Sequence, residues 1–83
     1  MFTFPEIRTT RTVEEQEQKI HDELKEYEEA VGDDKDKEAV DILHAAETFL
    51  RVRFRGREAE LQRLIEATIA KNTARGYYAK SCY

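Results

Sequence analysis

Two acidic pairs with the same spacing are the strongest candidates for chemistry in this 83-residue sequence. Glu23 and Glu26 form the first pair, and Glu38 and Asp41 form the second. Side chains three residues apart lie side by side on an α-helix, so each pair can share one ligand. If the two helices pack antiparallel through these faces, four carboxylates meet, and such oxygen ligands suit a hard cation such as Mg²⁺ or Mn²⁺.

The second pair is the stronger signal because its neighbours on the predicted helix are apolar. At about 100° per residue, Ile42, Ala45 and Phe49 share an arc with Glu38 and Asp41. A carboxylate in apolar surroundings is costly unless something compensates its charge. The first pair lies on the flank of an apolar stripe, and taken alone it fits a solvated face in a chain with 18 acidic residues.

A polar group near the end of the chain is the other candidate. Lys71, Asn72 and Arg75 fall near the apolar inner face of a predicted helix. Cations at a helix C-terminus complement the helix dipole, and this role is favoured for Lys71 and Arg75 taken alone. The helix dipole does not explain the side-chain amide of Asn72, which lies between them. Two cations and an amide donor beside an acidic metal cluster would suit a polyphosphate.

Three helices separated by glycines must position these groups. The glycines are Gly32, Gly56 and Gly76, and the predicted helices span residues 13–31, 35–55 and 57–75. Thr12 and Glu15 fit a capping box at the start of the first helix, and Gly32 is its expected left-handed C-terminal cap. Asp33 and Asp34 are the expected N-caps of the second helix.

The predicted fold class is all-α, because the chain has three glycines, one proline and 39% charged residues. We expect a single domain over residues 1–83, with an extended N-terminal arm at 1–11 and a C-terminal tail at 77–83. The second and third helices are joined almost without a loop, which predicts an antiparallel helical hairpin between them.

The apolar patterns of the first two helices differ. The first carries one narrow stripe, formed by Val13, Ile20, Leu24, Tyr27 and Val31. The second carries two arcs, one formed by Ala39, Leu43, Ala46, Leu50 and Phe54 and the other by Ile42, Ala45, Phe49 and Val52. Two partner helices from one chain cover such a helix poorly. We therefore expect homodimers or homotetramers that complete a four-helix-type bundle.

The amino-acid composition limits which partners and cellular settings we expect for the protein. A net charge of −4 disfavours nucleic acid as the main partner, and no apolar run is long enough to span a membrane. The acidic N-terminal region does not resemble a signal peptide. A single cysteine, Cys82, favours a reducing, cytoplasmic setting. The sequence also lacks a glycine-rich phosphate loop, a nucleophile elbow and a zinc-ligand spacing.

Taken together, the motifs resemble the MazG-like nucleotide pyrophosphohydrolases of the all-α NTP pyrophosphatase superfamily. The family signature is E-x-x-E, a spacer and E-x-x-D. Here Glu23 to Glu26 is followed, after eleven intervening residues, by Glu38 to Asp41. The segment from Lys71 to Tyr78 resembles the closing K-N-x-x-R-G-Y-Y of the family, so the resemblance covers roughly residues 13–80.

This resemblance implies Mg²⁺-dependent hydrolysis of a (deoxy)nucleoside triphosphate to the monophosphate and pyrophosphate. It implies that the metal-holding, catalytic carboxylates are Glu23, Glu26, Glu38 and Asp41, and that the phosphate contacts are Lys71, Asn72 and Arg75. One carboxylate would take the proton of the attacking water. Family members are dimers or tetramers, which agrees with the two-sided second helix.

The chain departs from the family pattern at two places. Many relatives have a glutamate at the position of Asp22, and many carry an extra N-terminal helix for which residues 1–11 are too short. The alternative within the enzyme class is a phosphoribosyl-ATP pyrophosphohydrolase. The alternative outside it is a non-catalytic helical oligomerisation module whose carboxylates hold a structural cation or form salt bridges across a dimer.

Overall fold

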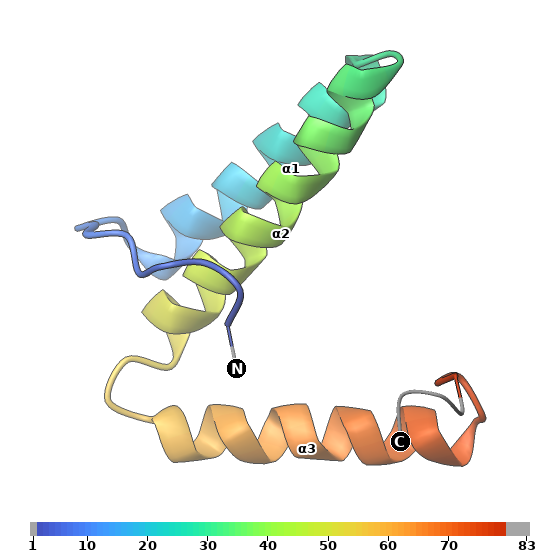
Figure 1. The fold of residues 1–83 in the computed structure, drawn as a ribbon. Coiled ribbons are helices and arrows are strands. Elements are labelled where there is room, and N and C mark those ends of the chain that lie inside the picture. The colour runs from blue at the N-terminus through green and yellow to red at the C-terminus, as the bar shows by residue number, and fades with distance from the viewer. Residues whose placement is uncertain (1, 80–83) are drawn as a thin grey trace.

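The computed structural model describes residues 2–79, which form three helices and no strand. α1 spans Val13–Glu29, α2 spans Asp33–Arg53 and α3 spans Glu58–Ala74. Residues 2–12 form an arm without regular secondary structure (Figure 1). The all-α prediction is confirmed, and each predicted helix end lies within about two residues of the observed one, the usual uncertainty of helix ends.

Two of the predicted helix signals are confirmed in atomic detail. At the start of α1, the Thr12 hydroxyl accepts from the Glu15 amide at 3.1 Å, and the Glu15 carboxylate accepts from the Thr12 amide at 2.9 Å. After α3, Gly76 has φ +71° and its amide donates to the Thr73 carbonyl, while the Tyr77 amide donates to the Asn72 carbonyl. This pair of bonds is a Schellman motif.

The predicted caps between the first two helices were wrong. Ala30, in an extended conformation, ends α1, and Gly32 (φ +60°) is the N-cap of α2 rather than the C-cap of α1. Asp33 and Asp34 lie inside the first turn of α2, where acidic side chains complement the helix dipole without capping it. Within the connection 30–32, the positive φ is at Gly32, directly before the first turn of α2.

The helical hairpin is formed by α1 and α2, and not by α2 and α3 as predicted. α3 leaves the end of α2 at a steep angle and extends away from the hairpin (Figure 1). Hydrogen bonds fix this corner: the Arg57 amide donates to the Phe54 carbonyl at 2.7 Å, and the Arg57 guanidinium donates to the Arg53 carbonyl at 3.0 Å. Gly56, at φ +76°, turns the chain between them.

The seam between α1 and α2 is narrow and mixes polar with apolar residues. Among residues 2–79, the buried apolar residues are Ala45 on α2 and Leu61 on α3, whereas Gln16, Glu23, Glu47 and Thr48 are buried and polar. Leu24 and Val31, predicted for the buried stripe of α1, are 43% and 77% exposed. Val13, Ile20 and Tyr27 of that stripe are half-buried, and the buried Gln16 and Glu23 lie among them, so α1 presents a mixed polar and apolar face to α2.

Candidate metal centre

Three of the four predicted carboxylates meet on the α1–α2 seam. Glu23 comes from α1, and Glu38 and Asp41 come from one face of α2. Each offers one carboxylate oxygen, and the three oxygens lie within 4.8 Å of one another. Glu23 is buried, Glu38 is half-buried and Asp41 is exposed, so the cluster runs from the seam to the surface. The predicted approach of the two acidic pairs is therefore observed for these three residues.

Two oxygens of this cluster lack hydrogen-bond partners. With the carboxyl groups ionised, Glu23 Oε2 and Glu38 Oε2 are buried and accept from no group among the described residues. The other Glu23 oxygen lies 2.7 Å from Lys19 Nζ. Among residues 2–79, this is the one ion pair that compensates the negative charge of the cluster. Anionic oxygens withdrawn from water without a partner are costly. The donor set fits a hard divalent cation, which binds carboxylate oxygens and compensates their excess charge.

The fourth predicted carboxylate, Glu26, lies beside the cluster and is exposed. A hydrogen bond with Glu23 raises the pKa of Glu26, and the charges of Glu23 and Glu38 act in the same direction. On the other side, the hydrogen bond from Lys19 lowers the pKa of Glu23 although burial opposes it. Within this pair, Glu26 therefore takes up a proton before Glu23. Asp22, the departure from the family pattern, is exposed and accepts from Gln18 at 3.0 Å.

The predicted phosphate contacts do not join the carboxylates within one chain. Lys71, Asn72 and Arg75 lie at the C-terminal end of α3, which points away from the α1–α2 hairpin (Figure 1). The Asn72 amide donates to the Tyr78 hydroxyl at 3.4 Å, and the Arg75 guanidinium lies 5.9 Å from the centre of the Tyr77 ring. Because the corner after α2 sets the direction of α3, these residues form a separate group.

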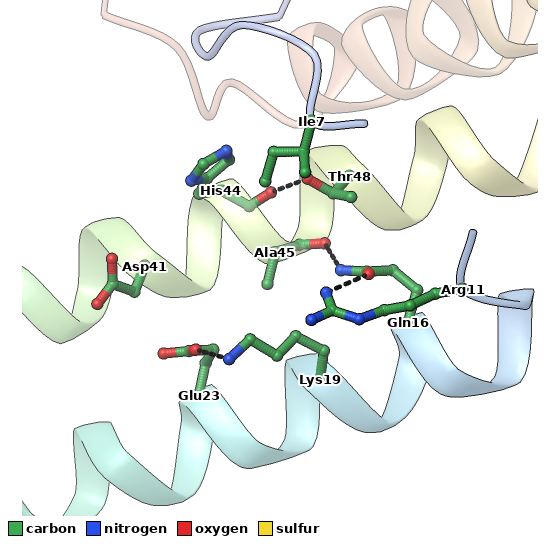
Figure 2. A pocket seen from close by; sticks show the side chains of 9 residues that line it. All are labelled: Ile7, Arg11, Gln16, Lys19, Glu23, Asp41, His44, Ala45 and Thr48. Carbon is green, nitrogen blue, oxygen red and sulfur yellow. Dashed lines mark hydrogen bonds and ion pairs between the residues drawn. The ribbon is translucent and has the colours of Figure 1, made fainter. Parts of the chain in front are cut away.

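A small pocket of about 80 Å³ adjoins the carboxylate cluster (Figure 2). Its lining residues are Ile7, Arg11, Gln16, Lys19, Glu23, Asp41, His44, Ala45 and Thr48. Gln16, only 1% exposed, accepts from the Arg11 guanidinium at 3.3 Å and donates to the Ala45 carbonyl at 3.3 Å. The pocket therefore has a carboxylate end at Glu23 and Asp41 and a polar, cationic end at Gln16 and Arg11.

The N-terminal arm forms one wall of this pocket and is fastened to α2 through its backbone. The Glu47 carboxylate accepts from the amides of Thr3 and Phe4 at 2.9–3.0 Å, and the Arg51 guanidinium donates to the Phe4 carbonyl at 2.7 Å. The Phe4 ring stacks on His44, with 4.4 Å between ring centroids. Burial acts to raise the pKa of Glu47, but the bonds from Phe4 and Thr3 outweigh it and lower this pKa.

Sequence reasoning missed several residues around the cluster. Lys19 precedes Glu23 by four residues, so the standard helix ion-pair spacing was available as a signal. Gln16 lies one heptad before Glu23, a spacing that places both on the same seam. Glu47 gave no such signal, because its partners are 43 and 44 residues away in the sequence.

Comparison with protein-family models, curated proteins and solved structures returned no match to this chain. In residues 2–79, none of the helices combines the length and the apolar character needed to cross a membrane. Cys82, on which the predicted setting depends, lies outside the described residues.

Proposed function

We propose that this protein is a Mg²⁺-dependent, MazG-like nucleotide pyrophosphohydrolase that converts a (deoxy)nucleoside triphosphate to the monophosphate and pyrophosphate. The observation that carries the proposal is the cluster of Glu23, Glu38 and Asp41, with oxygens within 4.8 Å and two buried oxygens that lack partners. A helix pair held together only by packing gains nothing from such an arrangement, because each unpartnered anionic oxygen weakens the seam.

The residues that would hold the cation are Glu23, Glu38 and Asp41, with Glu26 beside them. A bound Mg²⁺ or Mn²⁺ would supply charge neutralisation for the phosphate chain and would lower the pKa of water. The cluster would fix the position of the cation, and one of the carboxylates would accept the proton of the water that attacks the α-phosphorus. We place this activity in the reducing cytoplasm, on the basis of the single cysteine.

Self-association is part of the proposal, and the exposed surface supports it. The chain exposes 6486 Å², whereas a compact monomer of this mass exposes about 5,200 Å². Its radius of gyration is 14.9 Å, against about 12 Å for a compact chain of this length. The excess area is of the order that one partner buries in a standard interface, about 800 Å² or more.

The apolar arc that faces away from α1 is the surface we assign to this contact. Leu43, on that arc, is 46% exposed, and Leu64 on α3 is 51% exposed. A second copy that covers both would complete the four-helix-type bundle. In such a dimer or tetramer, Lys71 and Arg75 would contact phosphate at the cluster of a neighbouring copy, because α3 points away from its own cluster.

A direct assay tests the enzymatic proposal. The protein is incubated with Mg²⁺ and a panel of canonical and modified nucleoside triphosphates, and monophosphate and pyrophosphate are measured. We expect equal amounts of the two products from at least one nucleotide, and loss of turnover in Glu38→Gln. The matched control is Glu28→Gln, which changes an exposed acid on α1 and should keep full activity. A wild-type protein inactive on every nucleotide would leave the oligomerisation module as the better account.

A further inference from the structure

We propose that the pocket enclosed by the N-terminal arm, α1 and α2 is an oxyanion subsite, in which Arg11 and Lys19 bind a phosphoryl group of the substrate next to the metal centre. This inference rests on the proposed function, since it names where the phosphate chain lies. It differs from the role suggested for the end of α3, because both cations belong to the same chain as the carboxylates.

The first support is the meeting of two cationic side chains at one small pocket. Arg11 comes from the arm and Lys19 from α1, and both line the pocket (Figure 2). Arg11 has no ion-pair partner among residues 2–79; its guanidinium is held by the neutral Gln16 side chain at 3.3 Å. The hydrogen bond to Glu23 raises the pKa of Lys19, while burial and the charge of Arg11 act to lower it. Arg11 is therefore the cation at this pocket without an anionic partner among residues 2–79, and such a group favours an anion beside it.

The second support is the size of the space and the rigidity of its wall. About 80 Å³ holds a few water molecules or one tetrahedral oxyanion, and it is too small for a nucleoside. Gln16 and Thr48 line the pocket and are 1% and 2% exposed. Gln16 positions the Arg11 guanidinium through a hydrogen bond, so less freedom is lost when an anion binds.

The third support is the present partner of Lys19. Its ammonium lies 2.7 Å from Glu23 Oε1, in the cluster proposed to hold the cation. A divalent cation that binds Glu23 would compete with this ion pair, and the released Lys19 side chain still lines the pocket. Lys19 thus passes from Glu23 to the oxyanion when both ligands are present. Metal and phosphoryl group are then expected to bind cooperatively, each favouring the other by the same factor.

Calorimetric titration tests the proposal with inorganic pyrophosphate in the presence of Mg²⁺. We expect Arg11→Gln to weaken pyrophosphate binding by about 10- to 100-fold, the usual effect of losing a charge-assisted hydrogen bond. The matched control is Arg8→Gln, which changes an exposed arginine of the same arm that does not line this pocket. A parallel titration with a nucleoside monophosphate shows which end of the phosphate chain occupies the pocket. The ligand whose affinity falls in Arg11→Gln, pyrophosphate or the monophosphate, is the one whose phosphoryl group binds there.

Lys19→Met gives effects of opposite sign on the two ligands. Mg²⁺ alone should bind this variant more tightly than wild type, because Glu23 has lost its internal cation, whereas pyrophosphate should bind more weakly. Circular dichroism confirms that the variant is folded, and Arg11→Gln carries the test if it is not.

Equal affinities of Arg11→Gln and Arg8→Gln for both ligands would overturn the subsite, as would a wild-type protein that binds neither. If wild type hydrolyses nucleotides but Arg11 has no effect, the subsite fails and the proposed function stands. If pyrophosphate binding depends on Arg11 but no nucleotide is hydrolysed, the subsite stands and the proposed function fails.

Discussion

Replacing Glu38 with glutamine should change the stability of the protein in opposite directions with and without a divalent cation. Without metal, Glu38 adds a negative charge to a site where Lys19 compensates only Glu23. Its oxygen lies within 4.8 Å of those of Glu23 and Asp41. Glutamine keeps the shape of the side chain but removes the charge and one metal ligand. The metal-free variant should therefore be more stable than wild type, and Mg²⁺ should stabilise it much less.

The expected magnitude follows from the spacing of these oxygens. At 4.8 Å, the upper limit of these separations, two unit charges repel by about 1 to 3 kcal/mol for an effective dielectric constant between about 80 and 20. Asp41 is exposed, so solvent screening favours the lower value, about 1 kcal/mol. For a chain of this size this corresponds to a rise of about 4–8 °C in Tm. Conversely, Mg²⁺ at a hundred times its Kd should stabilise wild type by about 2.7 kcal/mol.

Thermal and urea unfolding monitored by circular dichroism measures both effects, first in EDTA and then across a Mg²⁺ titration. Glu28→Gln is again the control, because it removes the same charge from an exposed position of α1. If Glu38→Gln and Glu28→Gln unfold alike in EDTA and respond alike to Mg²⁺, the carboxylates neither repel one another nor share a cation. The reasoning about the metal centre would then be refuted.

Three further predictions address the seam, the arm and the assembly. Gln16→Leu should raise the free energy of unfolding in urea by about 1 kcal/mol, because the gain from apolar burial exceeds the loss of two long hydrogen bonds. The same change should weaken pyrophosphate binding, because Arg11 loses the hydrogen bond that positions it, and an unchanged affinity would contradict this. Because the pKa of Glu47 is lowered in the folded protein, its contribution to stability is present above the unfolded-state pKa and is lost as the pH falls through the folded-state pKa. The difference in unfolding free energy between wild type and Glu47→Gln should therefore shrink in acid, and a difference that stays constant down to pH about 2 would exclude this role. Light scattering should give at least twice the chain mass of 9.8 kDa, and Leu43→Lys should lower it; a monomer at micromolar concentration would contradict the assigned contact surface.

Much of the acidic cluster could be predicted from the sequence, because helical periodicity places two of its members together. Glu38 and Asp41 share a face of α2 by their spacing, and their apolar neighbours marked that face as the inner one. Packing of α1 against this face then brings Glu23 to them. These are local signals, and they do not depend on the direction of α3 or on the arm.

The composition of the seam was harder to predict, because apolar pattern alone was used to find it. Leu24 and Val31 looked buried but are exposed, while Gln16 is buried and polar. A buried polar residue is satisfied by its partners, here the Ala45 carbonyl and Arg11, and these partners lie on other segments of the chain.

The direction of α3 and the position of the arm could not be predicted from local sequence patterns, because both depend on contacts between separate segments of the chain. The corner after α2 depends on backbone bonds of Arg57 and on the positive φ of Gly56. A short connection permits a hairpin but does not require one. The arm is held by the Glu47 carboxylate through backbone amides, which no side-chain pattern reveals.

The position of water attack tests the central claim most directly. Hydrolysis of a substrate nucleotide is run in ¹⁸O-labelled water with Mg²⁺, and the products are analysed by mass spectrometry. The account predicts one labelled oxygen in the nucleoside monophosphate and unlabelled pyrophosphate, with no reaction in Glu38→Gln. Release of labelled inorganic phosphate, or turnover that persists in Glu38→Gln, would contradict it.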